Sequence, residues 1–482
     1  MVSLSGCGIP FGAGGPEGSA VSPTAPAVRD AEAKRRRPGA VVRDFELAAA
    51  PLAFELAGRQ ITTWAYGSSV PGKEIRVKAG EVVRARLTNH LPLPTTIHWH
   101  GIALRNDMDG VPDLTQRPIP SGGSLTYEFT APDPGTYFFH PHVGTQLDRG
   151  LYAPLIIEDP REPGGYDTEL VVVLDDWTDG FGESPDAILA RLKHSGSGMN
   201  MGSMGGMAGM GHGSRLLGGD AGDVAYPLYL VNGRPPQDPA RFEAKAGQRV
   251  RLRVINAGSD TAFRLAIGGH QLTVSHSDGF PVVPAVGDAV LLGMGERFDA
   301  LVTLQAGVFP LVALAEGKEG AALAVIATGA GGTPAPDVRP AELQRRILVL
   351  SQLNAASAAA LPQASPDRTI KLTLAGDMGR YRWTINGKTS DQGVLLPVRQ
   401  GERVRLNFEN RSMMFHPMHL HGHSFSVRGE GGPGPRKDTV IVPPMEQVTV
   451  DFTANNPGQW MLHCHNVYHQ EAGMATTLSY RQ

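Results

Sequence analysis

Apolar and polar residues alternate along much of the chain after residue 40, with a period of two rather than a helical period. Three segments, 80–89, 247–256 and 401–410, share one pattern: a glycine, then alternating charged and apolar residues, then an asparagine nine positions after the glycine. A period of two is expected for a strand with one wet face. Each copy therefore predicts a turn followed by a strand of a β-sandwich, and the repeat predicts three related domains.

Composition and length favour the same fold class. The 482 residues include 60 glycines and 38 prolines, a density that favours many short strands and turns. This length corresponds to about three domains. The net charge of −3 lacks the basic excess that a nucleic-acid or anionic-membrane surface requires, and no run of 18 apolar residues occurs. We expect a mostly β protein with neither a nucleic-acid partner nor a transmembrane span.

The repeat and the Gly/Pro-rich stretches define the expected domains, which are a disordered leader or tether at 1–40 and domains at 41–160, 166–330 and 341–482. The leader contains Cys7 after Leu4-Ser5-Gly6, which resembles the lipidation box of exported bacterial lipoproteins, although only four residues precede that box. We expect an exported protein, extracellular or at the cell surface or in the periplasm. A lipid anchor at Cys7 and an incidental cysteine are the two alternatives.

Histidines separate the three copies by chemistry. Pairs with one residue between them occur five times, whereas 16 histidines placed at random would give about half a pair. Nine and eleven residues beyond the asparagine of the repeat, the three copies have His98 and His100, Leu265 and Ile267, and His419 and His421. Five and seven residues beyond a later glycine, they have His140 and His142, Val312 and Leu314, and His463 and His465. We therefore expect metal ligands in the outer domains and none in the middle domain.

The run His463-Cys464-His465 predicts two different metal sites on one strand. Side chains on a strand alternate between faces, so the two imidazoles face one way and the thiol faces the other. A cysteine with two histidines and a distant methionine is the ligand set of a blue-copper centre. The chain supplies this set as His416, Cys464, His469 and Met474. Structural zinc sites have no use for methionine and usually bring paired cysteines, so copper is favoured over zinc.

Eight histidines remain for the second predicted site, on the face of the strand opposite to Cys464. They are His98, His100, His140, His142, His419, His421, His463 and His465. Eight imidazoles are too many for one ion. With two or three ligands each, they suit three metals that keep open positions for a small molecule, and all-imidazole coordination fits copper.

These motifs resemble those of the three-domain multicopper oxidases, which include laccases, bilirubin oxidases and bacterial cuprous oxidases. The resemblance spans 41–482 and rests on His98-Trp99-His100-Gly101, His140-Pro141-His142, the run from His416 to His423, and His463-Cys464-His465 through His469 and Met474. It implies three cupredoxin-like Greek-key β-sandwich domains, an all-β fold, and four copper ions. The implied ligands are His416, Cys464, His469 and axial Met474 for type 1 copper, His98 and His419 for type 2, and His100, His140 and His465 with His142, His421 and His463 for the two type 3 coppers. His423 matches no ligand.

The resemblance also implies an activity, in which one-electron donors are oxidised and dioxygen is reduced by four electrons to water. Asp109 matches a proton-relay acid of bacterial members, and a turn-forming Asp-Gly is its alternative. Many relatives have glutamate after the second type 1 histidine, where this chain has Gln470, so Glu471 is a substitute candidate relay. Asp438 matches an acid near the type 1 histidine and is a candidate to contact a phenol or a copper ion.

The electron donor is suggested by a Met-rich loop at 199–212 in the middle domain, with five methionines among glycines. Thioethers select Cu(I), and the loop is similar to inserts of copper-tolerance oxidases. We therefore expect an oxidase of Cu(I), of phenols or aromatic amines, or of Fe(II), acting in copper tolerance. The alternatives are a general laccase whose loop is an incidental Gly-rich segment, a copper nitrite reductase, which the histidine pairs in both outer domains disfavour, and a copper-sequestering protein without catalysis.

Overall fold

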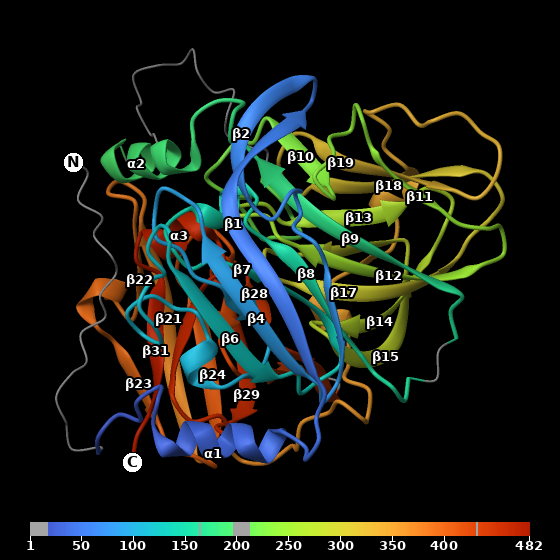
Figure 1. Cartoon of the computed structure of the whole chain (residues 1–482). Coiled ribbons are helices and arrows are strands. Elements are labelled where there is room, and N and C mark those ends of the chain that lie inside the picture. Colours follow the sequence, from blue (N-terminus) through green and yellow to red (C-terminus); the bar gives the residue numbers. More distant parts are fainter. Residues whose placement is uncertain (1–17, 163–164, 196–212, 430–431) are drawn as a thin grey trace.

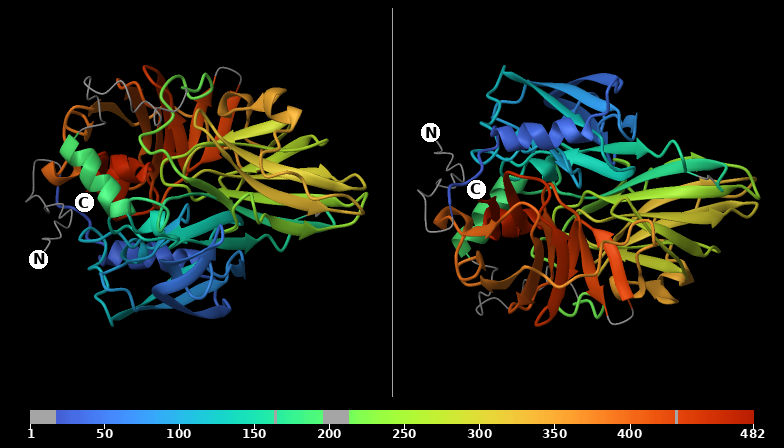
Figure 2. Two further views of the ribbon diagram at one scale, coloured as in Figure 1. Left: turned by 90° about the horizontal axis from the view of Figure 1, so that it is seen from above. Right: turned by 90° about the horizontal axis from the view of Figure 1, so that it is seen from below.

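The computed structural model describes residues 18–162, 165–195, 213–429 and 432–482. Its six sheets form three β-sandwiches, which confirms the predicted all-β fold (Figure 1). The first and third sandwiches lie against each other, and the second extends away from both, as the views in Figure 2 show. The Met-rich loop and Cys7 lie outside the described residues, so the expectations for them stay predictions.

The first sandwich contains two four-stranded sheets. In sheet order, the strands are β2 (Arg59–Tyr66), β1 (Val42–Leu56), β4 (Val82–Asn89) and β6 (Ser124–Thr130) in one sheet, and β3 (Ile75–Lys78), β8 (Ala153–Glu158), β7 (Gly135–His140) and β5 (His98–His100) in the other. Two short 3-10 helices, η1 (Asn106–Met108) and η2 (Gln146–Arg149), lie in its loops. The first predicted repeat strand is β4, in which Val83, Ala85 and Leu87 are buried in the core.

The second sandwich contains two six-stranded sheets. In sheet order, the strands are β10 (Leu228–Val231), β9 (Thr168–Trp177), β12 (Arg249–Asn256), β17 (Arg297–Thr303), β14 (Leu272–Ser277) and β15 (Phe280–Gly287) in one sheet, and β11 (Ala240–Glu243), β19 (Ala321–Ala327), β18 (Val308–Ala315), β13 (Phe263–Ile267), β16 (Ala289–Leu292) and β20 (Ile347–Leu348) in the other. Helix α2 (Pro185–Ser195) follows β9.

The third sandwich repeats this strand order in its first sheet. In sheet order, the strands are β22 (Arg382–Ile385), β21 (Arg368–Asp377), β24 (Arg403–Asn410), β29 (Gln447–Thr453), β26 (Phe425–Gly429) and β27 (Gly432–Lys437) in one sheet, and β23 (Leu395–Val398), β31 (Ala475–Tyr480), β30 (Gln459–Cys464), β25 (His416–Leu420) and β28 (Thr439–Val442) in the other. Its short helices are η5 (Ser390–Gln392) and α3 (Val467–Glu471).

A one-residue insertion separates the second sandwich from the third. Asn256 and Asn410 end equivalent strands, and each side-chain amide donates a hydrogen bond to a carbonyl further along the chain. The acceptor is Thr261, five residues on, for Asn256 and Met414, four residues on, for Asn410. Counting along the sequence from the asparagine therefore places the next strand of the second sandwich one residue too early.

Strand pairing gives the same offset. Ala266 lies opposite Val312 in the second sandwich, as His419 lies opposite His463 in the third. The expectation from sequence counting is thereby corrected: the counterparts of His419 and His421 are Ala266 and Gly268, not Leu265 and Ile267. The prediction that the middle domain has no ligands at these positions is unaffected.

The described part of the leader is ordered, which corrects the expectation of a disordered tether for residues 18–40. Helix α1 (Pro26–Arg35) packs against β6, where the Glu32 carboxylate accepts hydrogen bonds from the amide and hydroxyl of Thr130, at 2.8 and 2.7 Å. The Val21 carbonyl accepts a hydrogen bond of 2.9 Å from Gln459 of the third sandwich. The segment therefore joins the first and third sandwiches.

The boundary after the second sandwich also differs from the expected one. The 3-10 helix η3 (Ala341–Gln344) buries Leu343 in a small apolar cluster with Ala266 and Val312, and β20 pairs with β16. These residues belong to the second sandwich, and a further 3-10 helix, η4 (Leu350–Gln352), follows before the third sandwich begins at β21. Among the described helices, none has the length and apolarity needed to cross a bilayer.

Candidate metal centre

Four strands from two sandwiches bring the eight histidines together. In the first sandwich, His98 of β5 lies opposite His140 of β7. In the third, His419 of β25 lies opposite His463 of β30. Residues two apart on a strand share a face, so each strand contributes a pair to the gap between the sandwiches. The side chains of all eight histidines are buried.

The eight imidazoles form one continuous cluster, called here the imidazole cluster. His98 stacks on His421 with ring centroids 3.7 Å apart, and His100 stacks on His419 at 3.8 Å. Each stack joins a ring of the first sandwich to a ring of the third. Groups whose ligand atoms lie within 4.8 Å of one another include His98, His100 and His140; His98, His142 and His421; and His419, His421 and His463.

Hydrogen bonds fix the outward nitrogen of several imidazoles. The Nδ1 atoms of His98, His140 and His463 lie 3.0, 3.0 and 2.9 Å from backbone carbonyl oxygens. A carbonyl only accepts, so these Nδ1 atoms carry the proton and the Nε2 atoms are left as electron-pair donors. This is the arrangement that a metal-ligating histidine requires.

The inward nitrogens lack hydrogen-bond partners in a manner that fits bound metal. Within the described part of the chain, the Nε2 atoms of His98, His142 and His419 and the Nδ1 atom of His100 are buried without a hydrogen-bond partner. The Nε2 atoms of His421 and His463 lie 3.1 Å apart, and Nδ1 of His421 faces the Asp109 carboxylate while Nδ1 of His463 faces a carbonyl. Two unprotonated nitrogens cannot hydrogen-bond to each other, but they can bind one cation. The donor set therefore fits copper.

Seven of the eight imidazoles are held neutral, as metal ligation requires. Burial lowers the pKa of His100, His140, His142, His421 and His463 well below the usual value, and the neighbouring imidazoles lower it further. Burial likewise lowers the pKa of His419 and His465. Because desolvation disfavours the charged form, the cluster keeps its electron pairs available at neutral pH.

Asp109 lies at the edge of the imidazole cluster. Its carboxylate is fully buried, 3.0 Å from His421 Nδ1 and 3.2 Å from His98 Nδ1. Burial raises the pKa of Asp109 above its usual value, although the contact with His98 opposes this shift. A buried carboxyl with a raised pKa that contacts two imidazoles of the cluster is suited to take up and release a proton.

Asp438 lies at the imidazole cluster and not at the sulfur site, which differs from the expectation of an acid that contacts a phenol. The side chain is fully buried, with Oδ1 at 3.2 Å from His100 Nε2 and 3.4 Å from His419 Nδ1. Burial alone would raise its pKa, but the charge and hydrogen bonds of Arg297 hold the pKa of Asp438 well below its usual range. Such a carboxylate is a fixed anion that an external phenol does not reach.

The sulfur site lies on the opposite face of β30. His416 Nδ1 and His469 Nδ1 lie 3.1 Å apart, and Cys464 Sγ lies 3.5 and 3.6 Å from them. The outer nitrogens are held by Ser412 Oγ, 2.8 Å from His416 Nε2, and by Asp223 Oδ2, 2.9 Å from His469 Nε2. All three ligand atoms face one point, as a blue-copper centre requires.

The thiol of this site lies in the hydrophobic core. Burial raises the pKa of the Cys464 thiol above its usual value, so the thiolate needs a cation to form there, and a metal ion is such a cation. Trp383 lies over His469, with ring centroids 4.0 Å apart. Met474 is fully buried in the same core, and its backbone pairs with Cys464 and His469. The buried thiol and the cysteine-histidine set fit copper.

Asp223 is a site residue that no sequence motif indicated. It belongs to the second sandwich, yet Oδ2 contacts His469 Nε2 and accepts a hydrogen bond of 2.7 Å from the Tyr381 hydroxyl. A lone aspartate in a loop gives no periodic or spacing signal. The one sequence signal that could have indicated Asp223 is its position 13 residues beyond Met210, the last methionine of the Met-rich loop.

Glu471 lies on α3, beside the sulfur site. Its carboxylate accepts a hydrogen bond of 3.2 Å from the Gln470 amide, and burial raises the pKa of Glu471 while the nearby Lys193 opposes the shift. Among the contacts of the described residues, none joins Glu471 to the imidazole cluster. Its candidate role as a proton relay to that cluster therefore lacks a contact, whereas Asp109 has one.

Comparisons with known proteins agree with this geometry. Models of the multicopper oxidase family match residues 52–162, 169–330 and 363–482. The chain is 48% identical to a protein named multicopper oxidase MmcO from Mycobacterium tuberculosis, over 99% of this chain and 94% of that protein. It is 29% identical to a copper resistance protein A homolog from Pseudomonas syringae pv. tomato, over 89% of this chain and 91% of that protein.

Solved structures give the same result. A multi-copper oxidase from Pseudomonas thermotolerans superposes with a TM-score of 0.70 at 29% identity, over 92% of this chain and all of that one. A laccase from Botrytis aclada superposes with a TM-score of 0.75 at 25% identity, over 92% of this chain and 88% of that chain.

Proposed function

This chain belongs to the multicopper oxidase family, and we propose that it oxidises Cu(I) with dioxygen as the electron acceptor, in copper tolerance. Phenols, aromatic amines and Fe(II) are further candidate donors. The observation that carries the proposal is the sulfur site back to back with the imidazole cluster, joined by His463-Cys464-His465.

Four copper ions are the proposed cofactors. His416, Cys464, His469 and Met474 would hold type 1 copper, and His98 and His419 type 2 copper. The ligands of the two type 3 coppers would be His100, His140 and His465, and His142, His421 and His463. This division is supported by the contacts between inward nitrogens, 3.1 Å for His421 and His463 and 3.4 Å for His140 and His465, because each pair belongs to one proposed ion.

Bound copper supplies one-electron redox chemistry, so that four single-electron oxidations are matched to one dioxygen that becomes two waters. The chain provides the path and the protons. The electron donor would pass its electron at the edge of His469, where Asp223 contacts the imidazole and Tyr381 contacts Asp223. The backbone of Cys464 continues into both flanking imidazoles, and His463 Nδ1 also donates to the Cys464 carbonyl, at 2.9 Å. Asp109 can release a proton toward the imidazole cluster.

Cu(I) as donor is supported by the surface next to the sulfur site. Met413, three residues before His416, is 68% exposed, and its carbonyl accepts a hydrogen bond from the Asp220 amide. An exposed thioether on a segment that pairs with the backbone of Asp220 is a soft site, which suits Cu(I). The Met-rich loop precedes Asp220 in the sequence. The copper resistance protein among the relatives supports the same role.

The experiment compares donors on the fully copper-loaded enzyme. kcat/KM is measured for Cu(I), Fe(II) and a dimethoxyphenol, with and without residues 199–210, and in Met413→Leu. We expect the deletion to raise KM for Cu(I) selectively, and Met413→Leu to do so more weakly. Val283→Leu, at an exposed apolar position on β15, serves as the control. Equal changes for Cu(I) and the phenol would favour a general laccase instead.

Export with a lipid anchor at Cys7 is the proposed localisation. It is supported by the Leu4-Ser5-Gly6-Cys7 box, which lies outside the described residues. Cys7→Ser is expected to move the protein from the membrane fraction to the soluble exported fraction. An unchanged distribution would leave Cys7 as an incidental cysteine.

A further inference from the structure

The second sandwich supplies no imidazole to the cluster, yet its β16–β17 turn touches it. Gly295 lies in this turn with φ +79°, and a Cβ built on it would lie 2.8 Å from His465 Cδ2 and 3.0 Å from His100 Cε1. Real Cβ atoms do not approach a ring as closely as 2.8 Å, so a side chain here would displace His465 and press on His100. His100 belongs to the first sandwich and His465 to the third. The backbone of Gly295, from the second sandwich, packs against both rings.

Arg297 begins β17 directly after this turn and is fully buried. Its two terminal amino groups donate to the two carboxylate oxygens of Asp438, each at 2.7 Å. The guanidinium also donates to the carbonyls of Gly295, at 3.0 Å, and Thr136, at 3.1 Å, and lies 3.7 Å from Asp278 Oδ1. This bidentate geometry fixes a carboxylate in one plane, and here it joins all three sandwiches.

Asp438 in turn contacts two ligand candidates. Oδ1 lies 3.2 Å from His100 Nε2 and 3.4 Å from His419 Nδ1, and the Thr439 hydroxyl lies 3.2 and 3.1 Å from the same nitrogens. The hydroxyl also donates to Asp438 Oδ1, at 2.9 Å. His419 Nδ1 also lies 2.9 Å from the backbone carbonyl of Asp438. A carboxylate and a carbonyl only accept hydrogen bonds, so the proton of each ring sits on the nitrogen that faces Asp438. His100 Nδ1 and His419 Nε2 are then left as ligand atoms.

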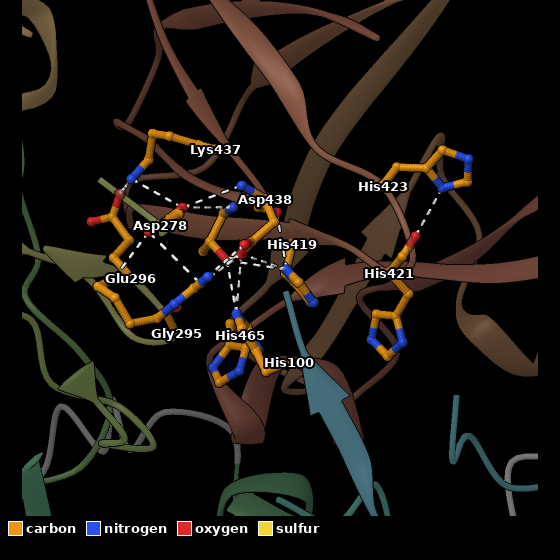
Figure 3. A network of polar contacts seen from close by, with 12 residues as sticks. His100, Asp278, Gly295, Glu296, His419, His421, His423, Lys437, Asp438 and His465 are labelled. Atoms are coloured by element: carbon orange, nitrogen blue, oxygen red, sulfur yellow. Dashed lines mark hydrogen bonds and ion pairs between the residues drawn. The ribbon is translucent and has the colours of Figure 1, made fainter. Parts of the chain in front are cut away.

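Further buried charges hold Asp438 from behind, as Figure 3 shows. The backbone amides of Asp438 and Thr439 donate to Asp278 Oδ2, both at 3.2 Å. Lys437 Nζ lies 3.1 Å from Asp278 and 3.1 Å from Glu296. Each buried charge thus has a partner, and removal of one partner alone would leave an uncompensated charge.

We propose that the β16–β17 turn of the second sandwich, which supplies no imidazole to the cluster, positions two copper ligands. Arg297 orients the Asp438 carboxylate, which sets the ring orientation and the tautomer of His100, a proposed type 3 ligand. The same carboxylate lies beside the ring of His419, a proposed type 2 ligand, whose Nδ1 faces the Asp438 carbonyl. Gly295 permits the approach. The inference rests on the ligand assignment proposed above. Arg297 and Asp438 are positioning residues, because they act through the imidazoles.

The test removes both charges together, with Arg297→Met and Asp438→Asn in one protein, so that no buried charge is left unpaired. Copper is counted per chain, and the type 2 signal is recorded by electron paramagnetic resonance at rest. We expect copper affinity at the imidazole cluster to fall roughly 10- to 100-fold, as for other partners of metal-bound histidines, with an altered type 2 spectrum. The blue absorption of the sulfur site should stay. Arg297→Lys, which keeps the charge but loses the bidentate fork, should give an intermediate spectrum.

A matched control lies on the same strand. Asp299 of β17 accepts hydrogen bonds of 3.0 and 2.6 Å from Arg251, and both residues are buried. Arg251→Met with Asp299→Asn should lower the melting temperature and leave the type 2 spectrum unchanged. Four coppers with an unaltered spectrum in the Arg297 and Asp438 variants would overturn the proposal, as would an equal spectral change in the control. A wild-type protein without four coppers and a type 2 signal would instead overturn the ligand assignment, and the inference with it.

Discussion

The second and third sandwiches share a strand order and differ in what covers one face. In the third, His419 and His463 are neighbours across β25 and β30 and face the imidazoles of the first sandwich. In the second, Ala266 and Val312 occupy the same pair of positions and are covered by Leu343 of η3. The comparison teaches that the same strand order can bury either a cluster of imidazoles or a layer of apolar side chains at this face.

The two faces place different demands on the chain. An apolar side chain such as Leu343 fills its face without further partners, and its burial removes apolar surface from water. Imidazoles need an outer hydrogen bond and an inner cation, because a buried polar group without a partner is costly. The third sandwich therefore depends on neighbours that supply Asp109 and Arg297, whereas the corresponding face of the second is complete within its own segment.

Cys464→Ser is expected to have the largest effect, because it removes the thiol that gives the third sandwich its sulfur site and so reduces the difference between the third and second sandwiches. The ligand set loses its thiolate, so we expect loss of the blue absorption, one copper fewer per chain, and activity reduced by more than the roughly 100-fold that outer partners of a metal cost. The blue absorption, copper analysis and oxygen uptake measure this. Full activity in the variant would contradict the electron path through this strand.

Leu343→Ala tests the other face. Leu343 is 1% exposed and packs on Ala266 and Val312, so its truncation leaves a cavity. We expect a loss of about 2 to 5 kcal/mol in the free energy of unfolding. Four coppers and the blue absorption should be retained by the folded fraction, since the residue touches neither cluster. Chemical denaturation with copper analysis of the folded protein measures both.

Acid should weaken the third sandwich through its neutral buried histidines. His423 accepts a hydrogen bond of 2.6 Å from Tyr480, and burial lowers its pKa to about 4, below the usual value of 6.5. The unfolded chain therefore binds a proton between these two values and the folded chain does not, so stability is full above pH 6.5 and falls toward pH 4. The loss from this residue approaches about 3 kcal/mol at pH 4.

The measurement compares copper-free wild-type protein with His423→Gln, which does not titrate, by denaturation from pH 7 to pH 4. The acid-induced loss should be smaller in the variant. Parallel slopes would show that His423 does not titrate differently in the two states.

Asp109→Asn is expected to have the smallest of these effects. The amide keeps the shape next to His421 but cannot carry a proton, so reoxidation by dioxygen should slow by roughly 100-fold, equivalent to about 2.7 kcal/mol. Reduction of the blue centre by the donor should not change. Stopped-flow reoxidation separates the two steps, and Asp107→Asn in the same loop is the control. Unchanged reoxidation would remove Asp109 from the proton path.

The sequence carried the fold class and most of the imidazole positions because both follow from short-range patterns. A period of two set the strands, and a spacing of two put histidine pairs on one face. Counting failed where the loop after Asn256 has one extra residue, because a count along the chain does not register a loop insertion. The leader was misjudged because composition shows low hydrophobicity at 18–40 but not the docking of Glu32 onto Thr130.

The sequence by itself determined the three sandwiches, the family and the positions of the candidate ligands, since each depends on local order along a strand. The tertiary structure decided which charged groups support those ligands. Asp223 reaches His469 from the second sandwich, and Asp438 faces the imidazole cluster because Arg297, 141 residues away in sequence, holds it there. Contacts between distant segments depend on how the sandwiches pack, and packing is a property of three-dimensional surfaces that no spacing along the chain encodes.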